Sequence, residues 1–248
     1  MENDSAARLQ SFLMERGRIA ARLAPFLGQE AASEKLLADI STYIDILMRW
    51  NARVNLTAIR DPEEIIARHF GESLFAARHL FPDHVATAPW AVRQGHDRAQ
   101  HGIGKSAHVA LADVGSGAGF PGIPIKLWAP SLSLTLIESN QKKATFLREV
   151  CRALTLTDVN IRNVRAESLP RSTFDVVTLR AIERFADILP SASSLVKPGG
   201  RLALLIGGAQ LPQARTILPK HDFALPVPIP LSQARILALA TLQGEPHQ

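Results

Sequence analysis

A glycine-rich segment that follows an apolar run limits the possible folds of this chain more than any other part of it. The apolar run covers residues 109–114 and predicts a strand, and the glycines follow directly after it. Pro121 then stands where a helix can begin, since proline is tolerated in the first helical turn. A strand, a glycine loop and a helix start in this order are typical of nucleotide-type cofactor sites, because glycine lets a ligand approach the backbone closely.

The spacing of these glycines departs from the dinucleotide fingerprint. Gly115 and Gly117 fit the pattern G-x-G-x-x-G, but its third glycine falls on Phe120. Asp113 lies two residues before the first glycine, where a carboxylate would repel a pyrophosphate. It would suit S-adenosylmethionine, which carries an ammonium group and a sulfonium and no phosphate. We therefore expect Asp113, Gly115, Gly117 and Gly119 to bind S-adenosylmethionine, although the glycines could also serve only a tight turn.

Further strands are predicted at regular intervals after the glycine loop. Apolar or alternating segments occur at 132–138, 159–164, 174–179 and 197–206. This order indicates an α/β fold with a Rossmann-like, mostly parallel sheet. The tail at 223–242 holds three prolines between apolar runs, and proline is barred from central strands, so we expect a C-terminal antiparallel hairpin at the sheet edge.

Charged residues follow the predicted strands where a ligand crevice would lie. Glu138 comes about 20 residues after Gly115, the distance at which an acid holds a ribose in nucleotide-binding units. Glu167 is placed to face an adenine edge, and Arg180 to point into the crevice. Each has a plainer interpretation: a solvated strand end for Glu138, a surface charge for Glu167, and an ion pair with a nearby acid for Arg180.

The chain divides into three predicted parts. Residues 1–85 form an N-terminal helical cap, 86–107 an irregular loop or insertion, and 108–248 the S-adenosylmethionine-binding domain. Within the cap, apolar spacing predicts helix over much of 30–81, and Asp61 followed by Pro62 marks a helix start.

The net charge and the placement of four cations suggest which kind of partner the protein binds. The formal charge is +5, which favours an anionic partner. Lys142 and Lys143 begin the helix after Glu138, where cations oppose the helix dipole; this suggests an RNA contact, extended by Arg148 and Arg165, or merely a solvated face.

The remaining sequence features point away from secretion, membranes and metals. The single cysteine, Cys151, lies on an apolar helical stripe and is expected in the core. The histidines show no ligand spacing with other donors, so we expect no metal. The N-terminus lacks the pattern of a secretory signal and no apolar run is long enough to span a bilayer, so we expect a cytoplasmic protein. We also expect a monomer.

Several motifs together resemble the glucose-inhibited division B family, whose members are bacterial 16S ribosomal RNA guanine-N7 methyltransferases of the class I S-adenosylmethionine-dependent fold. The resemblance runs from about residue 47 to residue 206. It is carried by Trp50-Asn51 with Asn55-Leu56-Thr57, Arg68-His69-Phe70 with Ser73, residues 113–122, 139–143, Arg148-Glu149, Ala166-Glu167 and Arg180-Ala181.

The resemblance implies both a cofactor pocket and a substrate. The pocket would be built from Gly115, Phe120, Glu138, the pair Ala166-Glu167 and Arg180. The substrate would be N7 of guanine 527 in 16S rRNA, naked or within the small ribosomal subunit. The family usually has aspartate where Glu138 stands, residues 86–107 are longer than usual, and the C-terminal tail diverges.

Methylation at N7 requires no general base, because that nitrogen already offers a lone pair. We therefore assign no acid–base residue, and take Arg180 and His69 as candidates to position the guanine or its phosphate; His69 could equally be a packed or capping residue. The alternatives are a methyltransferase acting on a small molecule or on another RNA, a non-catalytic RNA-binding module, and a nicotinamide dehydrogenase on the same fold.

Overall fold

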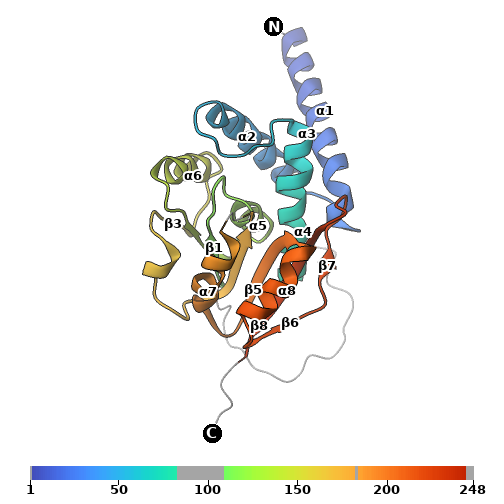
Figure 1. Ribbon diagram of the computed structural model, residues 1–248. Coiled ribbons are helices and arrows are strands. Elements are labelled where there is room, and N and C mark those ends of the chain that lie inside the picture. The colour runs from blue at the N-terminus through green and yellow to red at the C-terminus, as the bar shows by residue number, and fades with distance from the viewer. Residues whose placement is uncertain (1, 83–108, 182–183, 244–248) are drawn as a thin grey trace, which may run out of the picture.

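The structure is a computed structural model that describes residues 2–82, 109–181 and 184–243, with side chains from residue 15 onward. Its strands form one sheet in the order β3-β2-β1-β4-β5-β8-β6, with β7 also paired to β8 (Figure 1). The strands are β1 (Ala110–Val114), β2 (Ser133–Ile137), β3 (Val159–Arg162), β4 (Phe174–Arg180), β5 (Val196–Gly207), β6 (His221–Phe223), β7 (Val227–Pro228) and β8 (Arg235–Leu242).

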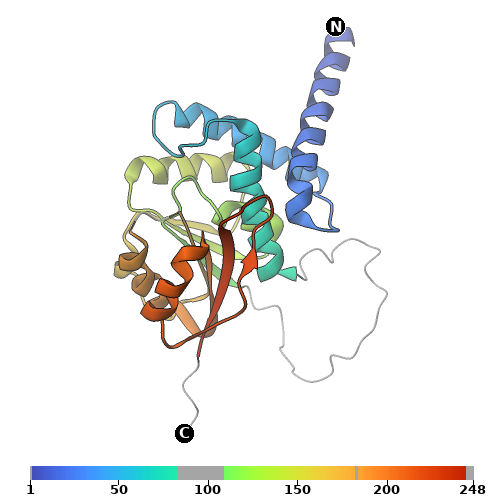
Figure 2. The same cartoon turned by 45° about the vertical axis from the view of Figure 1, so that its right-hand side comes forward.

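Helices cover both faces of this sheet. They are α1 (Glu2–Leu27), α2 (Glu34–Asn51), α3 (Pro62–Ile65), α4 (Glu72–Leu80), α5 (Gly122–Trp128), α6 (Gln141–Ala153), α7 (Phe185–Ser194) and α8 (Leu211–Ile217), with a π-helical turn η1 (Ile66–Gly71) and 3₁₀ turns η3 (Ala166–Ser168) and η4 (Gly208–Gln210). Figures 1 and 2 show α4 beside the β5–β8 end of the sheet and α7 and α8 on the opposite face. None of the described helices is long and apolar enough to cross a membrane.

The first five strands are parallel and are confirmed close to their predicted positions. Their side chains alternate between two apolar clusters, as the two faces of a doubly covered sheet require. In β1, for example, Leu111 joins the cluster under α2, α4, α5 and α6, while Ala112 and Val114 join the cluster under α7 and α8. Parallel pairing brings the carboxyl ends of β1, β2, β3 and β4 to one edge, where a crevice can form.

The predicted C-terminal antiparallel hairpin is confirmed at the end of the sheet, where β6 and β7 are the edge strands and β8 is the inner one. β8 lies between β5 and β6 and is therefore interior, not an edge. The reason is that β8 contains no proline: Pro226, Pro228 and Pro230 all precede it, and Pro228 pairs from the edge in β7. β8 itself is an apolar run that can hydrogen-bond on both sides.

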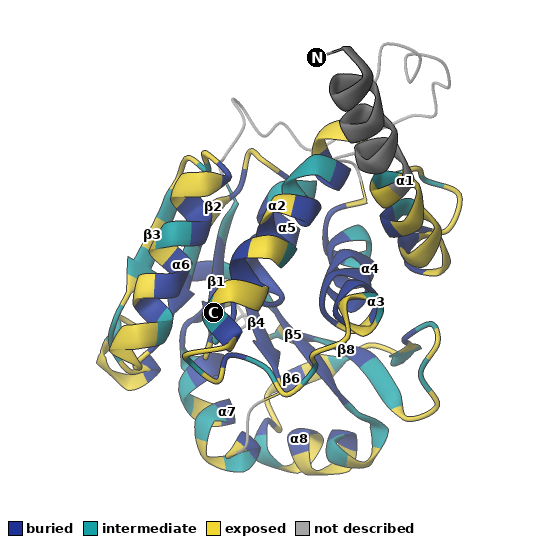
Figure 3. Ribbon diagram, turned by 90° about the horizontal axis from the view of Figure 1, so that it is seen from above, coloured by how far each residue is buried: buried dark blue, intermediate teal, exposed yellow. Residues whose placement is uncertain are grey.

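The N-terminal helices pack directly on the sheet. Figure 3 shows α4 and α5 largely dark blue, and the buried side chains of α2 and α4 belong to the same apolar cluster as Leu111 of β1. The predicted helix start is confirmed, since the Asp61 carboxylate accepts from the Glu63 N–H and Pro62 opens α3. The boundaries of the three predicted parts stay a prediction, and the predicted insertion at 86–107 lies outside the described residues.

Two local features were not predicted. The bounds of α1, Glu2–Leu27, lie outside the segment 30–81 whose apolar spacing indicated helix, and the π-helical turn η1 interrupts the helix that starts at Pro62. Gly71 ends this turn against Phe26 of α1, whose ring a Cβ atom there would approach to 2.5 Å.

Cys151 is buried in the core, as predicted, and burial raises the pKa of its thiol to about 11. It is therefore unreactive near neutral pH.

Candidate functional site

The glycine loop after β1 turns back onto the end of β2. Gly115, Gly117 and Gly119 have φ values of 68°, 56° and 84°, which side chains other than glycine rarely adopt. The Gly115 and Ser116 N–H groups donate to the Ile137 carbonyl at 2.9 and 3.1 Å. These bonds hold the start of the loop against the carboxyl end of β2.

Glu138, at the end of β2, is held in a fixed position beneath this loop. Its Oε2 accepts from the Gly117 N–H at 2.9 Å and its Oε1 accepts from the Asn140 N–H at 2.7 Å. The Asn163 side-chain amide also donates to the Glu138 carbonyl at 2.7 Å. A carboxylate has about four lone-pair sites, so roughly two of these remain for a ligand. Gly117 thus shapes the site through its N–H rather than by lining it.

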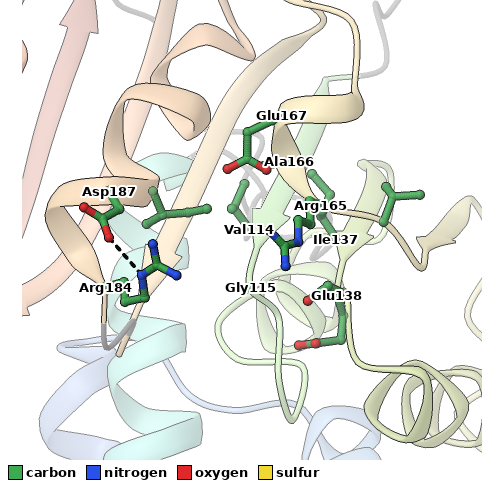
Figure 4. A pocket seen from close by; sticks show the side chains of 12 residues that line it. Val114, Gly115, Ile137, Glu138, Arg165, Ala166, Glu167, Arg184 and Asp187 are labelled. Atoms are coloured by element: carbon green, nitrogen blue, oxygen red, sulfur yellow. Dashed lines mark hydrogen bonds and ion pairs between the residues drawn. The ribbon is translucent and has the colours of Figure 1, made fainter.

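A cavity of about 310 Å³ opens beside Glu138 at the carboxyl edge of the sheet. In Figure 4, Glu138, Arg165 and Glu167 lie on one side of it, and the ion pair of Arg184 and Asp187, at 2.8 Å, lies on the other. Its lining residues are Val114, Gly115, Ile137, Glu138, Ser139, Val164, Arg165, Ala166, Glu167, Arg184, Asp187 and Ile188. Apolar side chains beside a buried carboxylate suit a nucleoside, with the apolar part for a base and the carboxylate for hydroxyl groups.

The Asp113 carboxylate points away from this cavity. It is 1% exposed, and it accepts from the Gly122 N–H at 3.2 Å and the Thr178 hydroxyl at 2.8 Å. Burial raises its pKa from 3.8 to about 6, against these two bonds, which lower it. A carboxylate on the first N–H of α5 stands where a phosphate would bind in a dinucleotide site. The arrangement therefore disfavours a pyrophosphate, while direct contact between Asp113 and an ammonium group stays a prediction that the described geometry does not favour.

Phe120 and Gly119 take part in packing rather than in lining the cavity. The Phe120 ring stacks between Tyr43, at 5.3 Å between centroids, and His69, at 4.7 Å. Gly119 lies so close to Tyr43 that a Cβ atom there would clash with the Tyr43 hydroxyl oxygen. The Tyr43 hydroxyl donates to the Ala118 carbonyl at 2.5 Å. These contacts fix the glycine loop to α2, and a contact of Phe120 or Gly119 with a ligand stays a prediction.

His69 is a buried, neutral side chain with both ring nitrogens in use. Arg180 can only donate, so Nδ1 accepts from Arg180 Nη2 at 3.0 Å. Nε2 consequently carries the proton and donates to the Thr57 hydroxyl oxygen at 2.7 Å. Burial, followed by the charge of Arg180, lowers the His69 pKa from 6.5 to about 3. The packed interpretation of His69 thus fits its surroundings, and it is not a base at neutral pH.

Arg180, at the end of β4, forms an ion pair with an acid, which is one of the two interpretations that its sequence position allowed. Its Nη2 lies 3.3 Å from Oε2 of the buried Glu72, and Arg235 of β8 reaches the same oxygen at 2.7 Å. Arg180 also donates to the Arg68 carbonyl at 2.6 Å. Burial lowers its pKa to about 10, so it stays charged at neutral pH. It does not line the cavity beside Glu138 but a second one.

Three of the four predicted RNA-binding cations lie on α6, and the fourth lines the cavity. Lys142 and Arg148 are exposed on α6 and Lys143 is half-buried there, while Arg165 lines the cavity. Asn140 caps α6 by accepting from the N–H groups of Lys142 and Lys143, which satisfies the backbone and leaves both ammonium groups outside the cap. Their contact with RNA stays a prediction.

Sequence reasoning missed Tyr43, Glu72, Thr178 and Arg235. Each comes from an element distant in sequence from the glycine loop, so no local pattern relates it to the site.

Comparisons with known proteins are consistent with this geometry. The family model GidB, described as rRNA small subunit methyltransferase G, matches residues 36–87 and 101–219. A curated relative named ribosomal RNA small subunit methyltransferase G, from Xanthomonas campestris pv. campestris (strain B100), is 32% identical over 231 residues, which is 92% of each chain. A relative of the same name from Xylella fastidiosa (strain 9a5c) is 39% identical over 180 residues, which is 72% of each chain.

Solved structures share the fold at low identity. A SAM-dependent methyltransferase from Aquifex aeolicus superposes with a TM-score of 0.53 and 15% identity, covering 76% of this chain and 97% of that one. A ribosomal protein L11 methylase from Lactobacillus delbrueckii subsp. bulgaricus gives a TM-score of 0.51 and 17% identity, covering 72% and 80%. At these identities the likeness shows the Rossmann-like methyltransferase fold alone.

Proposed function

The chain belongs to the GidB family of rRNA small subunit methyltransferases, and from this premise we propose that its target is N7 of guanine 527 in 16S rRNA. It is an S-adenosylmethionine-dependent methyltransferase that acts on the RNA of the small ribosomal subunit. The observation that carries the cofactor assignment is the placement of Glu138, held by the Gly117 and Asn140 N–H groups at the wall of a cavity that also has apolar walls.

The residues of the cavity fit S-adenosylmethionine. Glu138 would accept from the ribose hydroxyls, Ala166 and Ile188 would flank the adenine, and Glu167 would face its amino edge. Asp113 disfavours a pyrophosphate-bearing cofactor, while Glu138 suits the ribose of any nucleoside. When bound, the cofactor supplies a methyl group on a positively charged sulfur. The contribution of the chain is to bind and orient the two reactants, which can lower a barrier by up to about 7–11 kcal/mol.

The protonation states near the end of β4 support N7 as the target atom. An exocyclic amine must lose a proton on methylation, whereas N7 of guanine carries none. His69 is neutral with both nitrogens in use, and Glu72 is held by two arginines. Among the described residues next to Arg180, neither the His69 ring nor the Glu72 carboxylate is free to accept a proton. A reaction that needs no proton acceptor therefore fits best.

Binding of RNA would use the cations of α6 and of the cavity. Lys142, Lys143 and Arg148 lie on α6, which starts after Glu138, and Arg165 lines the cofactor cavity itself. A phosphate backbone that follows these side chains would pass close to the methyl donor. We propose further that the protein acts as a monomer in the cytoplasm, where its ribosomal substrate resides.

Methyl transfer to isolated particles tests this function. The full chain would be incubated with methyl-labelled S-adenosylmethionine and small ribosomal subunits from cells that lack this modification. We expect label in 16S rRNA, and none with nicotinamide cofactors in place of the donor. Label found only in small molecules, or in 23S rRNA, would overturn the proposal.

A further inference from the structure

A second cavity, of about 130 Å³, lies at the carboxyl ends of β4 and β5. Two guanidinium groups, those of Arg180 and Arg235, line it together with Ala181 and Gln210, and Phe185 and Ile206 add apolar walls. No local pattern in the sequence joins these residues, since they come from the end of β4, from β5, β8, η4 and α7. The site is distinct from the cavity beside Glu138.

The guanidinium groups of this second cavity keep free donors. Arg180 and Arg235 share a single carboxylate, that of Glu72, and both use Nη2 to reach it. The Nε atoms are buried away from the cavity surface, but no described residue accepts from Nη1 of either arginine, so these two groups can donate into the cavity. Gln210 accepts the Gly207 N–H at 3.0 Å through Oε1, which leaves its amide NH₂ to donate.

The charge contacts at the cavity are shared rather than paired one to one. Two guanidiniums contact the single carboxylate of Glu72, the neighbouring His69 is neutral, and the buried Asp113 interacts with Arg180 only at longer range. Guanidinium donors without a protein acceptor need a partner in the cavity, since burying unpaired polar groups is unfavourable. The cavity is therefore complementary to an anionic, oxygen-rich group, which guanidinium forks bind well.

The two cavities flank the same pair of strands. Val114 of β1 lines the first cavity, and its register partner Leu179 of β4 lines the second. On α7, Ile188 belongs to the first cavity and Phe185 to the second. A group bound in the second cavity is thus a close neighbour of the methyl donor.

We propose that the second cavity binds a phosphate of the RNA strand that carries the target guanine, with Arg180 and Arg235 as donors. This inference rests on the proposed function. The guanine itself is a poorer occupant, because an arginine fork takes the O6 and N7 edge of guanine and would cover the atom that is methylated. A phosphate next to the target nucleotide would instead fix the strand and leave N7 free.

Binding of inorganic phosphate to the full chain at constant ionic strength tests the site directly. Ala181 lines the cavity, is exposed, and has φ of 49°, a conformation that asparagine and aspartate tolerate better than alanine. Ala181→Asp and Ala181→Asn therefore differ in charge alone. We expect phosphate to bind at least about tenfold more weakly to the aspartate variant than to the asparagine variant, because like charges oppose binding. Equal affinities, or no phosphate binding to the parent, would overturn the proposal.

The source of the anion is distinguished by two further comparisons. Guanosine 5′-monophosphate should bind the parent at least about tenfold more tightly than guanosine, and Arg235→Met should remove this preference while S-adenosylmethionine affinity is kept. The KM for small-subunit RNA should rise in Ala181→Asp relative to Ala181→Asn. If phosphate binding depends on residue 181 while the two KM values agree, the site binds free phosphate and the RNA assignment is wrong.

Failure of the proposed function has a different signature. A parent protein that transfers no methyl group to 16S rRNA would overturn that function whatever phosphate does. Arg235→Met leaves Glu72 with one partner and could unfold the chain, so a thermal melt accompanies it, and the pair of substitutions at Ala181 keeps the inference falsifiable.

Discussion

Replacing Glu138 by alanine should weaken S-adenosylmethionine binding by about 1.5–3 kcal/mol, the usual worth of a hydrogen bond to a charged group. Two of the lone-pair sites of its carboxylate are taken by the Gly117 and Asn140 N–H groups, at 2.9 and 2.7 Å. The others face a cavity in which this is the only carboxylate that is buried, at 7% exposed, among the lining residues that the structure describes. The expected loss corresponds to a dissociation constant raised roughly 10- to 150-fold.

Titration calorimetry of the full chain with S-adenosylmethionine measures this effect. Glu138→Gln keeps the shape but loses the charge and places an NH₂ group against one of two backbone donors, so its affinity should fall almost as far. Glu167→Ala is the matched control, because that carboxylate lines the same cavity but is exposed, and its loss should be smaller. An unchanged affinity in Glu138→Ala, with a melting temperature close to that of the parent, would refute the role of Glu138 as the ribose acceptor.

The remaining predictions concern RNA, pH and stability. Lys142→Ala combined with Lys143→Ala should weaken RNA binding, lower the slope of log affinity against log salt by about 2, and leave cofactor affinity unchanged; equal slopes in a salt titration would make these side chains mere solvated surface. The single-turnover rate should be flat between about pH 6.5 and 9, because His69, with its pKa lowered to about 3, stays neutral throughout; a rising limb that disappears in His69→Gln would make it catalytic. The pKa of Asp113 is raised in the folded state to about 6, so the folded chain binds this proton more tightly than the unfolded chain, and the free energy of unfolding should fall by up to about 3 kcal/mol as pH rises from about 4 to above 6. Asp113→Asn should remove that fall in denaturant titrations and stabilise the protein at pH 8; a less stable variant at pH 8 would contradict it.

The parts of the site that sequence predicted are those encoded locally. Gly115 and Glu138 stand at the ends of consecutive strands of one βαβ unit, and parallel pairing necessarily brings such ends together. The direction in which the Asp113 carboxylate points could not be predicted in this way. It is set by two donors, the Thr178 hydroxyl on β4 and the Gly122 N–H at the start of α5, and only the fold brings Thr178 to Asp113.

The charge cluster shows why the rest of the site could not be predicted. Glu72, Arg180 and Arg235 come from a helix before the sheet, a central strand and the last strand, and only the fold places them in contact. β8 lies directly beside β5, and this position brings Arg235 within reach of Glu72. Sequence periodicity indicates that a strand exists, but not which strands it lies between.

Locating the transferred methyl group tests the central claim most directly. After incubation of the full chain with S-adenosylmethionine and unmodified small subunits, the 16S rRNA would be treated with borohydride and aniline, which cleave the chain at 7-methylguanosine, and the ends mapped by primer extension. We predict a single new cleavage at guanine 527 that is absent without the protein. Methyl incorporation without cleavage, or cleavage at another guanine, would contradict the account.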